Sequence, residues 1–516
     1  MKPIRLMAGF LTVGFWTLMS RVLGFVRDIV IAARLGDGPV AEAFLIAFSL
    51  PNMFRRFFAE GAFNMAFVPM FSKKLETEED AKAFARDAFN GLASVLIVFT
   101  LLAQLAMPWL VLAMASGFAA DDRFGMAVHF GRIAFPYILF ISLAALLSGV
   151  LNATGRFVAA AAAPVLLNVI LVSAMFLAET TGSDFGTFLI WAVPVAGIVQ
   201  FALVWWAAAK AGFQLLPAKP RVTPEMKRLA RIAAPAMLAG GVVQVNLLVG
   251  RQVASYFEGA IQYLNLADRL YQLPLGVVAI AIGVVLLPDL SRRLAAGDTD
   301  GGRNALNRAT EFALLLTLPA AAALIVIADP IVSVLYQRGA FSQEAAARTA
   351  QVTAIYGAGL PAFVLQKVLQ PLYFARHDTR SPFNFALVAM VLNALIAIGG
   401  APLIGFQAAA WATTIAGWAM VALLWRGSRG MGTAVKPDTR LRSRAWRILA
   451  ACAIMSACLV AAEWVLGDSL YRSGVRYGAL AILVGVGIVS YFATAQAIGA
   501  TQLGEIRRAM QRRSTT

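Results

Sequence analysis

Ionisable side chains are scarce in this chain of 516 residues, since Asp, Glu, Lys and Arg together make up 14% of it. Soluble domains carry about a quarter of such residues, so a soluble globular protein of this length is excluded. Hydrophobic residues make up 60% of the chain, and it repeatedly shows apolar runs of about 20 residues, the length of a membrane-spanning helix. The alternation of apolar and polar residues that marks a membrane β-barrel is absent. The composition therefore predicts an all-α polytopic membrane protein.

Cysteine and histidine are nearly absent, with two of each. Cys452 and Cys458 lie in one apolar run on different faces of the expected helix, so we expect packing residues and not a disulfide or a metal pair. His129 and His377 stand alone in the sequence. No set of His, Cys and Asp has metal-ligand spacing, and no nucleophile elbow or phosphate-binding glycine loop is present. We expect neither an enzyme site nor a bound metal or cofactor.

The apolar runs predict fourteen membrane helices. Their expected ranges are 6–32, 40–71, 88–114, 126–152, 157–179, 186–210, 231–256, 262–290, 307–328, 347–375, 382–403, 405–426, 446–466 and 475–499. Lysine and arginine concentrate in alternate loops, in the linker 426–447 and in the C-terminal tail, so the positive-inside rule places that side and both termini in the cytoplasm. This asymmetry explains most of the net charge of +17. We therefore interpret the basic tail as a topology and lipid-headgroup feature, with no nucleic acid as partner.

An internal repeat divides the predicted helices into two halves. The same offset of 225 residues separates Pro136 from Pro361, Thr154 from Thr379, and Asn168 from Asn393. Six helices per half is an even number, so the halves share one orientation and are related by a pseudo-two-fold axis along the membrane normal. Three parts are expected: an N-lobe at 1–212, a cytoplasmic linker with a C-lobe at 213–427, and a basic linker with two further helices and a basic tail at 428–516.

The second predicted helix carries charges near its middle. Arg55, Arg56 and Glu60 lie there, with Pro51 and Gly61 on either side. A charge at the bilayer centre costs about 3 kcal/mol on insertion scales, so it normally faces a polar cavity or a partner. Helix-breaking residues at membrane depth are tolerated only where protein or a watery cavity satisfies the freed backbone groups. We therefore expect this helix to line a cavity that suits an anion.

Basic residues outnumber acidic ones at the expected membrane depth. The basic set is Arg21, Arg27, Arg55, Arg56, Arg132, Arg251, Arg269 and Lys367, and the main acidic set is Asp28, Glu42, Glu60 and Asp268. Because a guanidinium offers paired donors to phosphate oxygens and keeps its charge, we expect four arginines to converge on a central cavity and hold a phosphate-bearing group. These four substrate-binding candidates are Arg21, Arg27, Arg55 and Arg269.

Polar neighbours of these arginines form a supporting set. It consists of Asp28, Glu42, Asn52, Arg56, Glu60 and Asp268. Asn52, Arg56 and Glu60 are spaced by four and share one stripe of a helix. The alternative reading is that internal ion pairs, such as Arg27 with Asp28 or Arg56 with Glu60, serve only to fix helix packing.

Three segments carry a family resemblance. Residues 20–28 read SRVLGFVRD and residues 50–63 read LPNMFRRFFAEGAF, and 267–270 read ADRL. These segments closely resemble the MurJ (MviN) family of lipid II flippases, and the similarity covers essentially the whole chain. The resemblance implies a fold of the superfamily that includes the MATE exporters, with two six-helix lobes and two extra helices.

The resemblance also implies an activity and a set of site residues. The family translocates the undecaprenyl-diphosphate-linked peptidoglycan precursor from the cytoplasmic to the periplasmic leaflet of the bacterial inner membrane. Its functional arginines match Arg21, Arg27, Arg55 and Arg269, its acidic partners match Glu42 and Glu60, and its groove for the lipid tail matches 446–499. Some members bind sodium, but 382–403 and 405–426 contain no Asp or Glu here, so no ion is expected.

Other functions compete with this one. A flippase for another polyprenyl-diphosphate glycan would have the same anionic cargo. Export of cationic drugs needs intramembrane carboxylates, so the net positive interior disfavours it. A non-transporting scaffold for cell-wall enzymes is a further class. The expected partners are lipid II, membrane lipids and proteins of cell-wall synthesis.

Overall fold

The computed structural model describes residues 6–56, 62–77, 80–432 and 435–501. Helices dominate this part of the chain, and ten helical segments in it are long and apolar enough to cross a membrane. They coincide with ten of the fourteen predicted spans, from the third to the sixth and from the ninth to the fourteenth. The other four predicted spans overlap α1 (Leu6–Leu35), α2 (Pro39–Arg55) with α3 (Ala62–Glu76), α10 (Pro224–Ala254) and α11 (Ala260–Ala295). These helices carry most of the predicted intramembrane charges.

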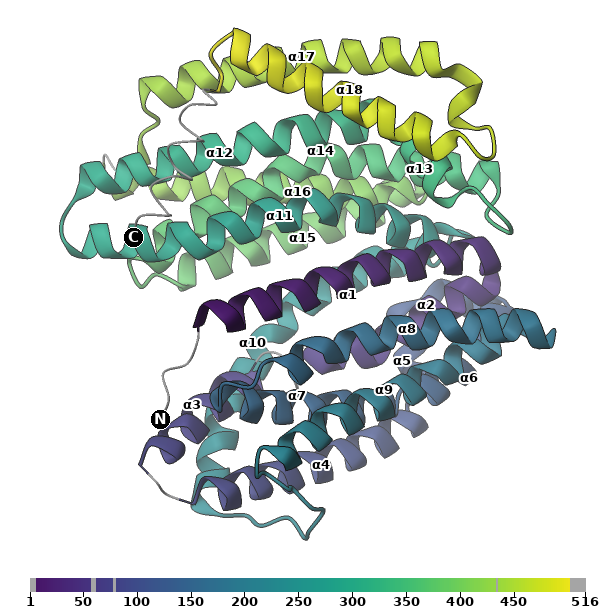
Figure 1. The fold of residues 1–516 in the computed structure, drawn as a ribbon, viewed down its shortest axis with the longest axis vertical. Helices are drawn as coiled ribbons and strands as arrows, with labels where there is room; N and C mark the ends of the chain where they lie inside the picture. The colour runs from purple at the N-terminus through teal and green to yellow at the C-terminus, as the bar shows by residue number, and fades with distance from the viewer. Residues whose placement is uncertain (1–5, 57–61, 78–79, 433–434, 502–516) are drawn as a thin grey trace. The chain divides into compact units, whose positions relative to one another are not determined.

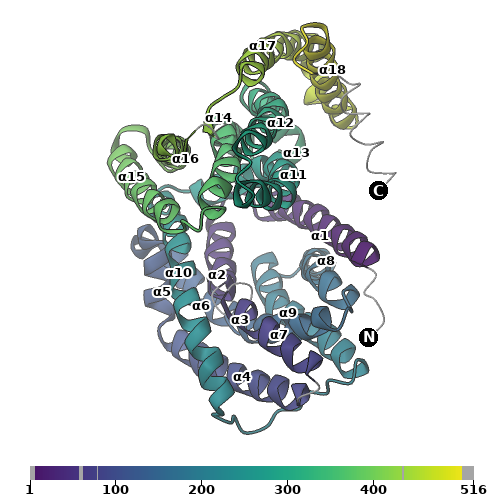
Figure 2. The same cartoon turned by 90° about the vertical axis from the view of Figure 1, so that its left-hand side faces the viewer.

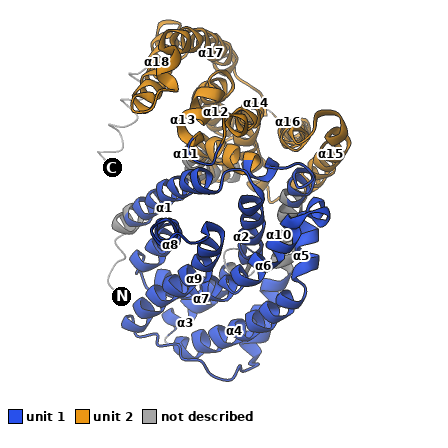
Figure 3. Cartoon of the chain, turned by 90° about the vertical axis from the view of Figure 1, so that its right-hand side faces the viewer, with its two compact units in different colours: residues 1–262, 338–341 blue, residues 263–337, 342–516 orange. Residues whose placement is uncertain are grey.

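The first of two compact units comprises residues 1–262 and 338–341 (Figure 3, blue). Besides α1, α2, α3 and α10 it contains α4 (Ala81–Leu105), α5 (Met107–Met114), η2 (Ser116–Ala120), α6 (Asp122–Ala134), α7 (Tyr137–Ala153), α8 (Val158–Thr181) and α9 (Phe185–Lys210). Helix α1 packs on α8, α2 packs on α6, and α9 packs on both α7 and α8. The short segment 338–341 joins this unit because the Ala340 N–H donates to the Ala33 carbonyl at 2.8 Å.

Prolines divide two helices that the sequence predicted as continuous. The expected span 88–114 breaks at Ala106, where α4 ends and α5 begins with Pro108 in its first turn. The expected span 126–152 breaks at 135–136, where Pro136 precedes α7. Proline has no N–H to donate and its ring crowds the preceding turn, so a helix ends or kinks there. The predicted helix 40–71 appears as α2 and α3, while 57–61 lie outside the described residues.

The far end of α10 is fastened to the short 3-10 helix η2. The Ser116 N–H donates to Gln252 Oε1 at 2.6 Å, and the Gly117 N–H donates to Ser255 Oγ at 2.9 Å. The approach is so close that a Cβ on Gly117 would lie 2.5 Å from the Ser255 carbonyl carbon. Only glycine fits between these two backbones.

The second unit comprises residues 263–337 and 342–516 (Figure 3, orange). It contains most of α11, then α12 (Thr299–Val326), α13 (Ala328–Tyr336), α14 (Gln343–Phe374), α15 (Arg380–Ile404), α16 (Gln407–Ser428), η3 (Arg429–Met431), α17 (Thr439–Leu466), η5 (Gly467–Leu470) and α18 (Arg476–Ala497). Helix α14 packs on α12 and α16, and α15 packs on α16 (Figure 2). The last two helices form an antiparallel pair whose first member lies along α12 (Figure 1).

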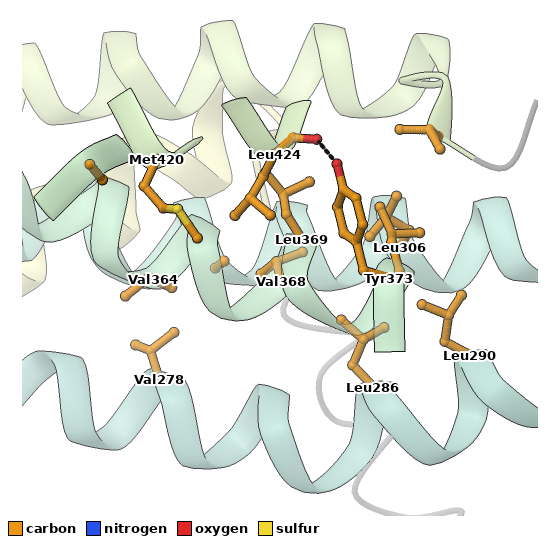
Figure 4. Packing of buried hydrophobic residues seen from close by; sticks show 14 of the residues in the cluster. Val278, Leu286, Leu290, Leu306, Val364, Val368, Leu369, Tyr373, Met420 and Leu424 are labelled. Carbon is orange, nitrogen blue, oxygen red and sulfur yellow. Dashed lines mark hydrogen bonds between the residues drawn. The ribbon is translucent and has the colours of Figure 1, made fainter. Parts of the chain in front are cut away.

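The core of the second unit joins α11, α12, α14 and α16. Leu286, Leu306 and Val368 meet there, and Tyr373 Oη donates to the Leu424 carbonyl at 2.6 Å (Figure 4). Lipid tails are as apolar as leucine, so membrane helices cohere through close packing and buried polar contacts rather than through the hydrophobic effect. A buried tyrosine hydroxyl that reaches a carbonyl supplies such a contact.

A polar cluster anchors the start of α17 to α12. The carboxylate of Glu311 on α12 pairs with Arg308, Arg440 and Arg444. The side chain of Asn307, one turn earlier, accepts from the Asp438 N–H at 3.1 Å. Glu311 is 7% exposed. Three guanidinium groups therefore compensate one buried carboxylate at the junction of the C-terminal helices with the rest of the unit.

Two turns repeat the same geometry in the two units. After α7 the Arg156 N–H donates to the Leu151 carbonyl at 2.9 Å, and after α14 the Asp378 N–H donates to the Tyr373 carbonyl at 3.0 Å. The residue before each donor is left-handed, namely Gly155 at φ 75° and His377 at φ 60°. The equivalent positions are thus 222 residues apart, so the predicted pairing of Thr154 with Thr379 is wrong at this turn.

Candidate functional site

Arg27 is buried on α1 and is held by two side chains. Its Nε and Nη2 donate to Asp28 Oδ1 at 3.0 and 2.7 Å, and its Nη1 donates to Asn168 Oδ1 on α8 at 3.0 Å. The guanidinium carbon lies 5.5 Å from the centre of the Phe48 ring. Arg27 is 6% exposed and Asp28 is 3% exposed. The ion pair of Arg27 with Asp28 that the sequence offered as an alternative reading is present, together with a second partner, Asn168, that the sequence did not predict.

Asn168 connects Arg27 to an earlier turn of α1. Its Nδ2 donates to the Ser20 carbonyl at 3.0 Å. Gly24 lies between Ser20 and Arg27 in the sequence, and a Cβ there would lie 3.6 Å from Asn168 Nδ2. The Asn168 amide therefore lies directly over the backbone of Gly24, at the distance of an ordinary van der Waals contact from a Cβ there. The only sequence signal at Asn168 was its match with Asn393, which is also buried.

The other arginine candidates of the first unit lie in different surroundings. Arg21 is exposed, two turns before Asp28 on α1. Arg55 is half-buried at the end of α2, and Arg56 follows it and is exposed. The predicted pairing of Arg56 with Glu60 cannot be placed, because Glu60 lies outside the described residues.

Asn52 belongs to the stripe that was predicted to run along α2. Its Nδ2 donates to the Phe48 carbonyl one turn earlier at 2.8 Å. Polar side chains in helices commonly satisfy their donors in this way. Asn52 is therefore engaged with its own helix in this structure.

Glu42 lies in a buried ion network at the start of α2. Its Oε2 is 2.7 Å from Arg123 Nη1, and its Oε1 accepts the Ile261 N–H at 3.1 Å. Arg123 Nη2 also lies 2.6 Å from Asp121 Oδ2, and the guanidinium carbon lies 4.4 Å from the Phe118 ring centre. Hydrogen bonding from Arg123 lowers the pKa of Asp121 below its usual value. Glu42 thus ties together the start of α2, the start of α6 and the beginning of α11.

Arg123 was missed as a partner of Glu42 by sequence reasoning. It follows Asp121 and Asp122 at the start of a helix, and such a basic residue resembles one of a solvated loop. The structure buries it to 5% exposure. The pairing spans 81 residues of sequence, so no local pattern predicts it.

The predicted site residues of the second unit lie on α11. Asp268 accepts a hydrogen bond from Gln272 one turn later, and Arg269 is half-buried. The ring of the neighbouring Tyr271 lies tilted against that of Tyr356 on α14, with ring centres 5.3 Å apart. Arg269 belongs to a different unit from the other three arginines, so the convergence of all four on one cavity stays a prediction.

Metal-binding side chains do not gather in the described part of the chain. No group of three or more His, Cys, Asp and Glu residues in it could hold a metal ion. Cys452 is buried and Cys458 is half-buried, and both are free thiols. Cys452 packs in a hydrophobic cluster with Ile448 and Met455, which agrees with a packing role for this thiol.

Comparison with known proteins decides the family. The family model described as lipid II flippase MurJ matches residues 31–484. The chain belongs to the MurJ family. A probable lipid II flippase MurJ of Rhizobium meliloti (strain 1021) is 45% identical over 518 residues, covering 98% of this chain and 96% of the relative. The lipid II flippase MurJ of Burkholderia cenocepacia is 36% identical over 411 residues, covering 78% and 80%.

Solved structures agree on the fold. A lipid II flippase MurJ in an inward closed conformation matches with a TM-score of 0.78 at 24% identity, covering 94% of this chain and 98% of the other. An inward-facing MATE multidrug transporter matches with a TM-score of 0.67 at 12% identity, covering 80% and 95%. The predicted all-α, MATE-like membrane fold and the predicted MurJ family are both confirmed. MurJ proteins are flippases, so the chain is a multi-pass transporter and not an enzyme.

Proposed function

We propose that this MurJ chain moves lipid II from the cytoplasmic to the periplasmic leaflet of the bacterial inner membrane, with both termini in the cytoplasm. Its family and its full-length relatives, which are described as lipid II flippases, support the cargo. The loops rich in lysine and arginine support the orientation. The observation that most directly supports the proposed binding site is the buried guanidinium of Arg27, which is held in place on a helix rich in apolar residues.

Arg27 can contribute to binding of the diphosphate without giving up its present partners. A guanidinium has five N–H groups, and three donors of Arg27 point to Asp28 and Asn168 among the described residues. The remaining N–H groups suit a phosphate oxygen, and such charge-assisted bonds are about twice as strong as neutral ones. Arg21, Arg55 and Arg269 are proposed as the other ligands. Asp28, Glu42, Asn52, Arg56, Glu60 and Asp268 are proposed as their supports.

Transport follows by alternating access in this proposal. The head group enters the cavity from the cytoplasm while the lipid tail stays in the bilayer, along 446–499. Neutralisation of the arginines by the diphosphate lets the N-lobe at 1–212 and the C-lobe at 213–427 rock against each other. The membrane potential acts on charged groups with about 2.3 kcal/mol per charge per 100 mV, which is enough to bias such a motion. Membrane lipids and cell-wall synthesis proteins are the proposed partners besides lipid II.

The test uses cells depleted of their own lipid II flippase. They express the native chain, Arg27→Ala, Arg27→Lys or the control Arg292→Ala at equal membrane levels, and a periplasmic probe measures accessible lipid II. Arg292 is a suitable control because it also pairs with an aspartate, Asp289, but its side chain is 79% exposed. We expect restored access with the native chain and with Arg292→Ala, little with Arg27→Ala, and partial access with Arg27→Lys, which keeps the charge but loses the planar fork.

Two other outcomes would contradict the proposed site or the proposed cargo. Full restoration by Arg27→Ala would remove Arg27 from the site. Failure of the native chain itself, with good expression, would favour a different polyprenyl-diphosphate glycan or a scaffold role.

A further inference from the structure

Asn168 lies against the face of α1 that carries Arg27. Its two amide atoms bond to two different turns of that helix, Oδ1 to Arg27 Nη1 and Nδ2 to the Ser20 carbonyl, each at 3.0 Å. Long helical side chains reach back over the preceding turn, so the guanidinium of Arg27 comes level with the backbone near Gly24. Asn168 is 5% exposed, and its bond to Arg27 is buried, while its bond to the Ser20 carbonyl is part-buried.

The two partners of Arg27 differ in charge. Asp28 holds Nε and Nη2, and its carboxylate neutralises the guanidinium. Asn168 holds Nη1 through a neutral oxygen. A neutral anchor fixes orientation without adding a negative charge that would repel a phosphate. Asn168 is also fixed itself, because its amide donates to the backbone of the same helix.

We propose that Asn168 is a positioning residue: it keeps the Arg27 guanidinium oriented towards the diphosphate of the lipid. The inference rests on the proposed function, because it assumes that Arg27 binds the diphosphate. Without Asn168, the hydrogen bonds of Arg27 that remain among those described go to the adjacent residue Asp28, and the guanidinium can turn together with that carboxylate. A misoriented guanidinium loses the directional part of its bonds to phosphate.

A double-mutant cycle tests the coupling. The native full-length chain, Asn168→Ala, Arg27→Ala and the double variant are placed in nanodiscs, and the affinity for undecaprenyl diphosphate is measured. We expect Asn168→Ala to weaken binding about tenfold, which corresponds to about 1.4 kcal/mol. In the Arg27→Ala background the same change should alter affinity less than about twofold, because a residue that acts through Arg27 has nothing left to act on.

Asn90 offers a matched control in the same unit. It is also 5% exposed, and it bonds to backbone groups through both amide atoms, accepting from Ala218 N–H at 2.7 Å and donating to the Arg86 carbonyl at 2.9 Å. Asn90→Ala removes an equally buried asparagine that has no bond to Arg27. It should lower the midpoint of thermal unfolding, Tm, and leave the affinity for undecaprenyl diphosphate within about twofold of native.

A second variant keeps Asn168 and moves it. A Cβ at position 24 would already touch Asn168 Nδ2 at 3.6 Å. The two further methyl groups of valine would therefore push the Asn168 amide aside. Gly24→Val should weaken binding as Asn168→Ala does, again only when Arg27 is present. It also answers the case in which Asn168→Ala does not fold.

Three results would separate the possibilities. An equal loss of affinity in both backgrounds, or no loss in folded Asn168→Ala and Gly24→Val, overturns the positioning role while the proposed function stands. If Arg27→Ala alone leaves affinity unchanged, the proposed site fails and the positioning role fails with it.

Discussion

Arg123 pairs with both Glu42 and Asp121. Replacing Arg123 with alanine should destabilise the first unit far more than replacing Asp121 with asparagine. The change removes the cation from the Glu42 carboxylate, which is 1% exposed, and leaves it with the backbone N–H groups of Gly259 and Ile261. Removing one member of a buried ion pair typically costs about 3–5 kcal/mol. Lost stacking on Phe118, at 4.4 Å, adds about 0.5–2 kcal/mol. The Asp121 side chain is 38% exposed, so its pair with Arg123 is worth about 1 kcal/mol at most.

Thermal unfolding of the purified chain in nanodiscs, followed by tryptophan fluorescence, measures this order. At about 2–4 °C per kcal/mol for a unit of this size, Arg123→Ala should lower Tm by about 15 °C and Asp121→Asn by at most about 4 °C. Glu42→Gln should fall between them, because the amide oxygen still accepts from Ile261 while the charge is lost. Equal decreases in Tm for Arg123→Ala and Asp121→Asn would refute the reasoning, since the loss of stability would then not depend on how deeply the ion pair is buried.

Three further changes follow from single contacts, each measured by the Tm of the purified chain. His377→Gly should raise the free energy of unfolding by about 1 kcal/mol, because the native residue is left-handed at φ 60° and glycine adopts that conformation without a side-chain clash. An unchanged or lower Tm would show that contacts of the histidine side chain offset the backbone strain. Gly117→Ala should lower Tm and detach η2 from α10, because its Cβ would lie 2.5 Å from the Ser255 backbone, whereas Gly125→Ala, with nothing within 4 Å, is the control and should not lower it. Glu311→Ala should lower the free energy of unfolding by about 3–5 kcal/mol, since it removes the buried carboxylate that three arginines share, while Arg308 keeps its pair with Asp438. A loss below about 1 kcal/mol would mean that water or lipid replaces the carboxylate.

The apolar runs predicted the fold well because membrane helices must satisfy their backbone within themselves. They predicted helix breaks less well. Pro108 and Pro136 end helices, whereas Pro361 stays inside α14, although Pro136 and Pro361 occupy matched positions in the predicted repeat. Whether a proline kinks or ends a helix depends on which neighbouring helix satisfies the freed carbonyl. That information is not local to the sequence.

The candidate site shows the same limit. The pair of Arg27 and Asp28 is adjacent in sequence and was anticipated as an alternative, and the structure contains it. The contact of Arg27 with Asn168 spans 141 residues, and nothing near either residue indicates it. The sequence predicts which charges lie at membrane depth, but their partners come from the packing of distant helices.

The carboxylate of Glu311 has a consequence for any shortened form of this protein. Two of its three partners, Arg440 and Arg444, come from α17. A chain truncated after residue 428 would keep Glu311 and lose those two cations. The remaining part of the second unit would then carry an ill-compensated carboxylate on the surface that α17 had covered. The two C-terminal helices are therefore part of the charge balance of the second unit and cannot be removed without leaving this carboxylate short of cations.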